Sequence, residues 1–196
     1  MKLSFKRITA VLAVAAVVGL ALVVLLHESP RREGSPSIGG PFTLVNHLGE
    51  TVTDADFRGH FLLLFFGYTY CPDVCPTTLT AISDALDLLG SDGDKVTPAF
   101  VTVDPERDTP EYLKEYLAYF HPRLVGLTGT SDQVAAAAGA YRVYYAKGGK
   151  AGIEDYIMDH TSVIYLMDPA GNYLAHFAND TTPEDMASGI GGHLKR

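Results

Sequence analysis

The apolar segment FLLLFFG at Phe61–Gly67 restricts the fold of this chain more than any other feature. Its seven residues carry no polar side chain, which is typical of a central strand that is covered on both faces. A turn with two cysteines follows directly, and from residue 77 apolar residues recur at helical spacing as far as Gly90. A strand, a turn and a helix in direct succession predict an α/β fold, in which helices cover a central sheet.

Strands and helices alternate along the rest of the chain. Two short strands are expected around residues 47–49. The later segments are a second central strand in VTPAFVTVD, a helix in DTPEYLKEYLAYF, a short strand in LVGLTG, a helix in SDQVAAAAGAY, a hairpin in HTSVIYLMDPAGNYLAHF and a final helix in TTPEDMASGIGGHLK. Asp108 or Thr109 is the expected cap of the second helix, and Ser131 that of the third. This order predicts a thioredoxin-like fold with an additional N-terminal β-hairpin and an antiparallel last pair of strands.

The first 28 residues are predicted to be a membrane anchor. Residues 8–26 are nineteen uncharged residues, enough to cross the hydrocarbon core, and they follow three cations, Lys2, Lys6 and Arg7. The run ends in bulky residues rather than in the small residues of a cleavage site, so we expect a retained transmembrane helix. The cations predict a cytoplasmic N-terminus, with the domain in the periplasm of a bacterial inner membrane or an equivalent extracytoplasmic space.

The remainder of the chain divides into a linker and one folded domain. Residues 29–41 are rich in proline, glycine and serine and are the expected flexible linker, and residues 42–196 are the expected domain. The chain has 15 Lys and Arg against 23 Asp and Glu, a formal net charge of −8. This excess of acid argues against binding to nucleic acid.

Cys71 and Cys75 are the only cysteines of the chain, and each is followed by proline. They stand between the central strand and its helix, where Pro76 is expected to begin the regular helix. A helix N-terminus favours thiolate over thiol, the form that attacks disulfides and binds metals. A structural disulfide would close so short a loop that it stabilises little. Thiol–disulfide exchange or a site for Cu(I) or zinc with a third, imidazole ligand is therefore the preferred interpretation.

His160 is the best placed of the seven histidines to be that third ligand. It opens the apolar strand TSVIYLM, and the start of this antiparallel strand should lie beside the end of the Phe61–Gly67 strand. We therefore expect His160 to lie near both cysteines. The segment DPERDTP, by contrast, is interpreted as a turn and a helix cap without a role in the chemistry.

Three segments resemble the signatures of the Sco/SenC family of membrane-anchored copper proteins: GYTYCPDVCP, VTVDPERDTPEYLKEY and DHTSVIYLMDPAG. The resemblance implies a thioredoxin-like domain behind an anchor and a tether. It also implies that Cys71, Cys75 and His160 bind copper, as Cu(I), Cu(II) or both. The recipient implied by the family is the copper A site of cytochrome c oxidase subunit II, with a periplasmic copper donor and a thiol reductant as further partners.

Three functions remain open from the sequence. The first is a copper metallochaperone for oxidase assembly. The second is a membrane-tethered thiol–disulfide oxidoreductase that reduces the cysteines of the copper A site, so whether the chain is an enzyme is left open. The third is a peroxiredoxin-like enzyme, for which no peroxidatic motif is present. His160 separates the first two, because copper binding should need it and thiol exchange should not.

Overall fold

The computed structural model describes residues 38–148 and 156–195, which belong to one compact unit, Ile38–Arg196. The predicted anchor and residues 29–37 of the predicted linker lie outside the described residues. Within the described part, no helix is both long and apolar enough to cross a membrane.

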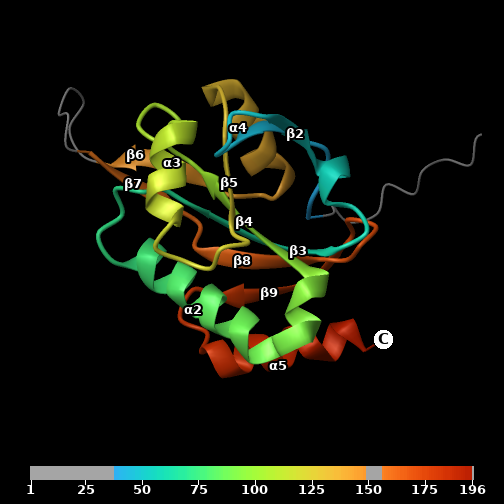
Figure 1. Ribbon diagram of the computed structural model, residues 1–196. Coiled ribbons are helices and arrows are strands. Elements are labelled where there is room, and N and C mark those ends of the chain that lie inside the picture. Colours follow the sequence, from blue (N-terminus) through green and yellow to red (C-terminus); the bar gives the residue numbers. More distant parts are fainter. Residues whose placement is uncertain (1–37, 149–155, 196) are drawn as a thin grey trace, which may run out of the picture. The chain divides into compact units, whose positions relative to one another are not determined.

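A seven-stranded sheet with the order β2-β1-β5-β4-β3-β8-β9 forms the centre of the unit (Figure 1). The strands are β1 (Thr43–Asn46), β2 (Thr51–Thr53), β3 (Phe61–Gly67), β4 (Val96–Thr102), β5 (Val125–Thr128), β8 (Val163–Met167) and β9 (Tyr173–Ala178). β3, β4 and β5 are parallel, whereas β8 pairs with β3, β9 with β8, and β1 with β5 in antiparallel fashion. The predicted α/β arrangement is therefore confirmed, and the N-terminal hairpin extends the main sheet through β1.

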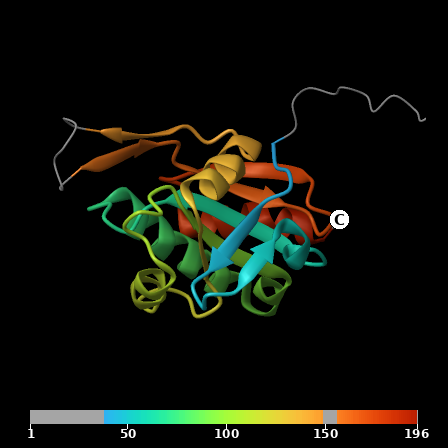
Figure 2. The same ribbon diagram turned by 90° about the horizontal axis from the view of Figure 1, so that it is seen from above.

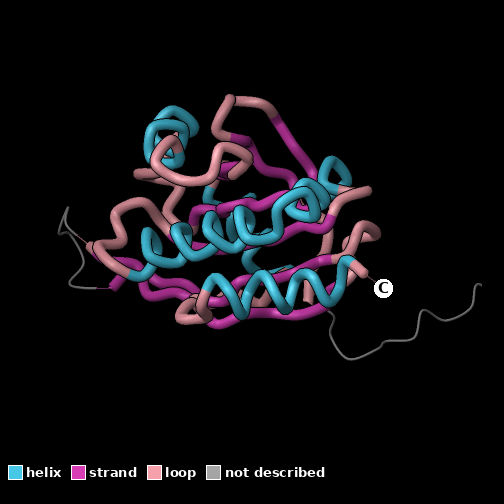
Figure 3. Tube along the Cα trace, turned by 60° about the horizontal axis from the view of Figure 1, so that its bottom comes forward, coloured by secondary structure: helices cyan, strands magenta, loops and turns pink. Residues whose placement is uncertain are grey.

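Helices cover both faces of this sheet (Figure 2). The helices are α2 (Val74–Leu89), α3 (Pro110–Leu117), α4 (Ser131–Ala140) and α5 (Pro183–Leu194), with short 3-10 turns at Asp54–Phe57 and Gly90–Lys95. α2 and α5 pack side by side (Figure 3), and α4 lies on the opposite face from α2 and α3 (Figure 2). β3 is accordingly buried from Leu62 onward, as its uninterrupted apolar sequence predicts.

Two helix starts differ from the predictions. α2 begins at Val74 rather than near Pro76, so Cys75 already lies in its first turn, where the following proline is tolerated. α4 is capped by Thr130 and not by Ser131. The Thr130 side chain accepts the backbone N–H of Gln133, and the Gln133 side chain accepts the backbone N–H of Thr130. Thr109 caps α3 as predicted.

The chain also forms a second, two-stranded sheet, which was not predicted. β6 (Tyr145–Gly148) pairs with β7 (Ile157–His160), and the two strands are called the histidine ribbon below. His160 is therefore the last residue of β7. The prediction that it opens the apolar strand, β8, was wrong. The reason lies in Thr161, which exchanges hydrogen bonds with Tyr144 and closes the ribbon before β8 begins.

Candidate metal centre

The two cysteines lie where the end of β3 meets the start of α2. Cys75 has no exposed surface, Cys71 is partly exposed, and both are free thiols. The backbone N–H of Cys75 donates to the sulfur of Cys71 over 3.4 Å, as a helix N-terminus would to an anion. Gly67 leaves space for the sulfur of Cys75, because a Cβ atom at residue 67 would lie only 2.8 Å from Cys75 Sγ.

His160 reaches this site from the histidine ribbon. Its Nε2 is 3.7 Å from Cys75 Sγ. Its Nδ1 lies 3.2 Å from the carbonyl oxygen of Thr161, which can only accept, so Nδ1 carries the proton. In the neutral ring the lone pair of Nε2 then faces Cys75, and this is the form in which an imidazole binds a metal. Tyr68 meets the ring edge-on, with 5.8 Å between ring centroids.

The electrostatics of the site divide the two thiols into one anion and one acid. Side-chain hydrogen bonds from Cys75 and His160, helped by the backbone N–H groups of Asp73 and Cys75, outweigh burial and lower the pKa of Cys71 to about 3. The hydrogen bond to Cys71, together with burial, raises the pKa of Cys75. Cys71 is therefore a thiolate at neutral pH, and Cys75 holds the proton that the pair shares.

The donors suit a soft metal ion, although they are not yet gathered around one. A sulfur and a nitrogen that bind one ion at about 2.3 and 2.0–2.1 Å are 3.7 Å apart, as Cys75 and His160 are, when their bonds meet at about 115–120°. Within residues 38–148 and 156–195, however, no three His, Cys, Asp or Glu side chains are arranged to hold a metal. A three-donor site at Cys71, Cys75 and His160 thus requires a rearrangement.

Asp108 holds the segment between β3 and α2, residues 68–73, which is called the cysteine loop below; the sequence interpretation missed this contact. This buried carboxylate accepts the backbone N–H of Thr69, over 3.1 Å, and the hydroxyls of Thr69 and Thr102. Burial raises the pKa of Asp108, and the bonds from the two threonines offset part of that effect. DPERDTP makes the predicted turn and cap, and its Asp108 in addition holds the cysteine loop.

Arg107, from the same segment, lies between the cysteine loop and the histidine ribbon. Its guanidinium pairs with the buried carboxylate of Asp104 and lies 3.7 Å from the centroid of the Tyr156 ring. The signal available in the sequence was position: the carboxyl ends of adjacent parallel strands, here β3 and β4, meet at one edge of a sheet.

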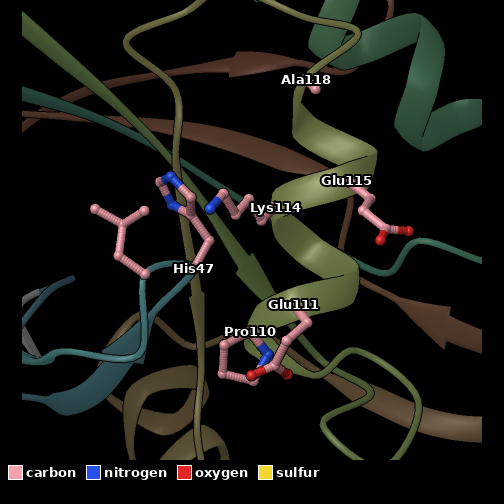
Figure 4. A pocket seen from close by; sticks show the side chains of 7 residues that line it. His47, Pro110, Glu111, Lys114, Glu115 and Ala118 are labelled. Atoms are coloured by element: carbon pink, nitrogen blue, oxygen red, sulfur yellow. The ribbon is translucent and has the colours of Figure 1, made fainter.

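The structure leaves the other described histidines away from the cysteines. His47 lines a groove of about 570 Å³ with side chains of α3, where it and Lys114 point toward each other (Figure 4). Its Nδ1 accepts the backbone N–H of Gly126 over 3.0 Å, so it is a satisfied structural residue. His121 lies near Asp87, and His176 contacts Tyr173.

A family model described as SCO1/SenC matches residues 30–195, most of the chain. The chain belongs to the SCO1/SenC family. The resemblance that three sequence segments carry is thereby confirmed. This SCO1/SenC protein is 44% identical over 197 residues to the protein SenC of Rhodobacter capsulatus, with 95% of this chain and 89% of that protein covered.

The human mitochondrial SCO1 homolog is 45% identical over 170 residues, which cover 86% of this chain and 56% of that protein. This SCO1/SenC protein thus spans little more than half the length of that relative. Among solved structures, Bradyrhizobium japonicum ScoI with copper bound matches with a TM-score of 0.73 and 48% identity, covering 82% of this chain and 99% of that one. BsSco is described as having a disulfide switch and as a member of a family of cytochrome c oxidase assembly proteins. It matches with a TM-score of 0.64 and 26% identity, covering 84% of this chain and 95% of that one.

Proposed function

We propose that this chain is a copper metallochaperone that binds copper through Cys71, Cys75 and His160 and delivers it during cytochrome c oxidase assembly. The proposal rests on one observation: an imidazole from the histidine ribbon and a cysteine of α2 lie 3.7 Å apart, 85 residues apart in sequence, at the site of the only other cysteine. Two thiolates and a neutral imidazole are donors for copper rather than for magnesium or calcium. The copper-bound relative supports the choice of metal.

The arrangement suits an ion that has to leave again. Three donors do not saturate the ion, so a cysteine or histidine of a recipient can bind before a donor of this chain is released. Copper passes on by such ligand exchange, without net oxidation or reduction. We propose the copper A site of oxidase subunit II as the recipient, with a periplasmic protein as the copper donor and a thiol reductant that keeps Cys71 and Cys75 reduced.

The proposed location follows from the same function. A helix at residues 8–26 would anchor the protein in the inner membrane, with residues 29–41 as a tether and the domain in the periplasm. The tether would give the domain reach toward a recipient in the same membrane.

A second candidate function is thiol–disulfide exchange, which the assignment of the thiolate to Cys71 favours. Cys71 would attack a disulfide of the recipient, and Cys75 would then displace the mixed disulfide, leaving a Cys71–Cys75 disulfide and a reduced recipient. The disulfide switch described for BsSco supports this reading. The complete burial of Cys75 argues against fast completion of the second step.

His160→Ala separates the two functions. In the reduced full chain, held in detergent, the substitution should weaken Cu(I) binding by about 100-fold or more, because it removes a ligand and not merely a neighbour of one. Affinity is measured by competition with a chromophoric Cu(I) chelator, and disulfide exchange is assayed on the same samples. His176→Ala, which removes an exposed imidazole from β9, is the matched control and should bind copper normally. Unchanged affinity in His160→Ala with exchange intact would reject the chaperone in favour of the oxidoreductase.

A further inference from the structure

The histidine ribbon is a weak support for a ligand. β6 and β7 pair only with each other, and the ribbon extends beyond the main sheet (Figure 2). Isolated two-stranded ribbons are marginally stable in water. His160 is the last residue of β7, so its distance from the cysteines depends on what holds this ribbon against the domain.

Arg107 holds the start of β7. Its Nη1 donates to the backbone carbonyl of Tyr156 over 3.0 Å, and its guanidinium carbon lies 3.7 Å from the centroid of the Tyr156 ring. Asp104 completes the contact, because it pairs with Arg107 and accepts the Tyr156 hydroxyl over 2.7 Å. Tyr156 is thus held at its backbone, at its ring and at its hydroxyl, immediately before β7 begins at Ile157.

The same guanidinium also contacts the cysteine loop. Its central carbon lies 4.6 Å from the ring centroid of Tyr70, the residue before Cys71, and 5.9 Å from that of Tyr68. Tyr68 in turn meets the His160 ring edge-on. One planar cation therefore touches both sides of the site, which lie far apart in sequence.

The chemistry of this position favours arginine. A guanidinium can stack on aromatic rings while its edge donates to a carboxylate and a carbonyl, which a lysine ammonium cannot do. Within the described residues, Arg107 Nη2 is buried without a hydrogen-bond partner, so the stacking and the two hydrogen-bonded contacts have to offset one unsatisfied donor. A second polar contact, Lys147 to Glu106 at 2.6 Å, is exposed and should contribute little, whereas the side chain of Met158 in β7 is buried in the core and, with Arg107, holds the ribbon.

We propose that Arg107 is a positioning residue that clamps the histidine ribbon to the cysteine loop and so keeps His160 within reach of the copper bound by Cys71 and Cys75. The proposal rests on the proposed copper site and goes beyond it. Without the clamp, the ribbon samples positions in which His160 is too far from the sulfurs. The apparent dissociation constant rises as the fraction of molecules with His160 in place falls.

Arg107→Lys is the main test variant, because Arg107→Ala would leave the Asp104 carboxylate buried without a cation. Cu(I) affinity is measured for the full chain, Arg107→Lys, His160→Ala and the double variant, together with the thiolate-to-Cu(II) absorption band. We expect Arg107→Lys to bind copper about tenfold more weakly, which is the loss expected if the ribbon holds His160 near the sulfurs in about a tenth of the molecules. We expect no further loss when His160 is already alanine, since the clamp acts only through that ring.

Arg123→Ala is the matched control. Arg123 is another partly buried arginine that donates to backbone carbonyls, those of Gly93 and Val96, at the opposite end of β4 from the cysteines. It should lower the melting temperature without changing copper affinity or the absorption band.

The outcomes separate this proposal from the proposed function. Equal affinity of wild type and His160→Ala would reject the copper site itself. A weak His160→Ala beside a normal Arg107→Lys would reject the clamp and leave the site standing. An equal loss from Arg107→Lys in both backgrounds would also reject the clamp, because it would mean general damage rather than an effect through His160.

Discussion

Replacing Gly67 with alanine would press a methyl group against the sulfur of Cys75. The new Cβ would be 2.8 Å from both Cys75 Sγ and Phe100 Cε2, about 0.6 Å short of the 3.4 Å at which ordinary contact begins. Phe100 is fully buried and packs against Phe65 and Tyr116, so at least part of the displacement falls on the sulfur of Cys75, which is buried as well. Overpacking of this kind costs about 1–3 kcal/mol, less the benefit of up to about 1 kcal/mol from replacing glycine.

The expected result is a melting temperature lower by up to about 12 °C, since the net cost is about 0–3 kcal/mol and each kcal/mol corresponds to about 2–4 °C in a domain of this size. Copper affinity should fall at least about tenfold, because a metal ligand displaced by half an ångström exceeds the tolerance of about 0.2 Å. The control is Gly139→Ala on α4, where a Cβ would meet nothing within 4 Å and should stabilise the helix. If Gly67→Ala melts like wild type and binds copper normally, the reasoning that seats Cys75 in the space left by Gly67 is refuted.

Two further substitutions or treatments test the chemistry of the loop. Iodoacetamide should alkylate Cys71 at a rate nearly constant from about pH 5 to 8, because a pKa of about 3 keeps it a thiolate, whereas an ordinary thiol slows tenfold per unit below its pKa of about 8.5. The alkylation rate is followed by mass spectrometry as a function of pH. The shape of this pH profile is the test, and not the absolute rate, because a low pKa also lowers the nucleophilicity of the thiolate. A rate that falls tenfold per pH unit would contradict a thiolate at Cys71. Asp108→Asn should lower the melting temperature by about 2–12 °C, since its amide N–H₂ would face the donors of Thr69 and Thr102 and leave about 1–3 kcal/mol of hydrogen bonding unmade. Unchanged melting would show that this carboxylate does not support the loop.

The parts of the fold that could be predicted are those with a local signal. β3 and α2 follow from an apolar run and a helical period. The expected antiparallel pairing of β8 with β3 placed His160 at the correct end of the sheet, near the cysteines. The cap of α4 was readable too, because Thr130 and Gln133 have capping-box spacing, and Ser131 was preferred without using that pattern.

The histidine ribbon and the Arg107 clamp had no such signal. YAKG and IMDH are four residues each and do not alternate cleanly between apolar and polar side chains, so neither predicts a strand by itself. The contact between Arg107 and Tyr156 joins residues 49 apart, and no spacing rule connects them. What the sequence could offer was the position of DPERD at the carboxyl end of a central strand, beside the cysteines.

The three candidate ligands differ in burial, so the site is accessible from one side only. Cys75 has no exposed surface and is fixed by α2 and by the space at Gly67, whereas Cys71 and His160 are partly exposed. In the proposed copper transfer, a ligand from the recipient would reach the ion from the side of Cys71 and His160, and these bonds would be the first to be replaced. His160 is also the donor on the less supported element, because β6 and β7 lie outside the main sheet. The clamp at Arg107 thus acts on the ligand whose release would begin transfer, and its strength should set how readily copper leaves as well as how tightly it is held.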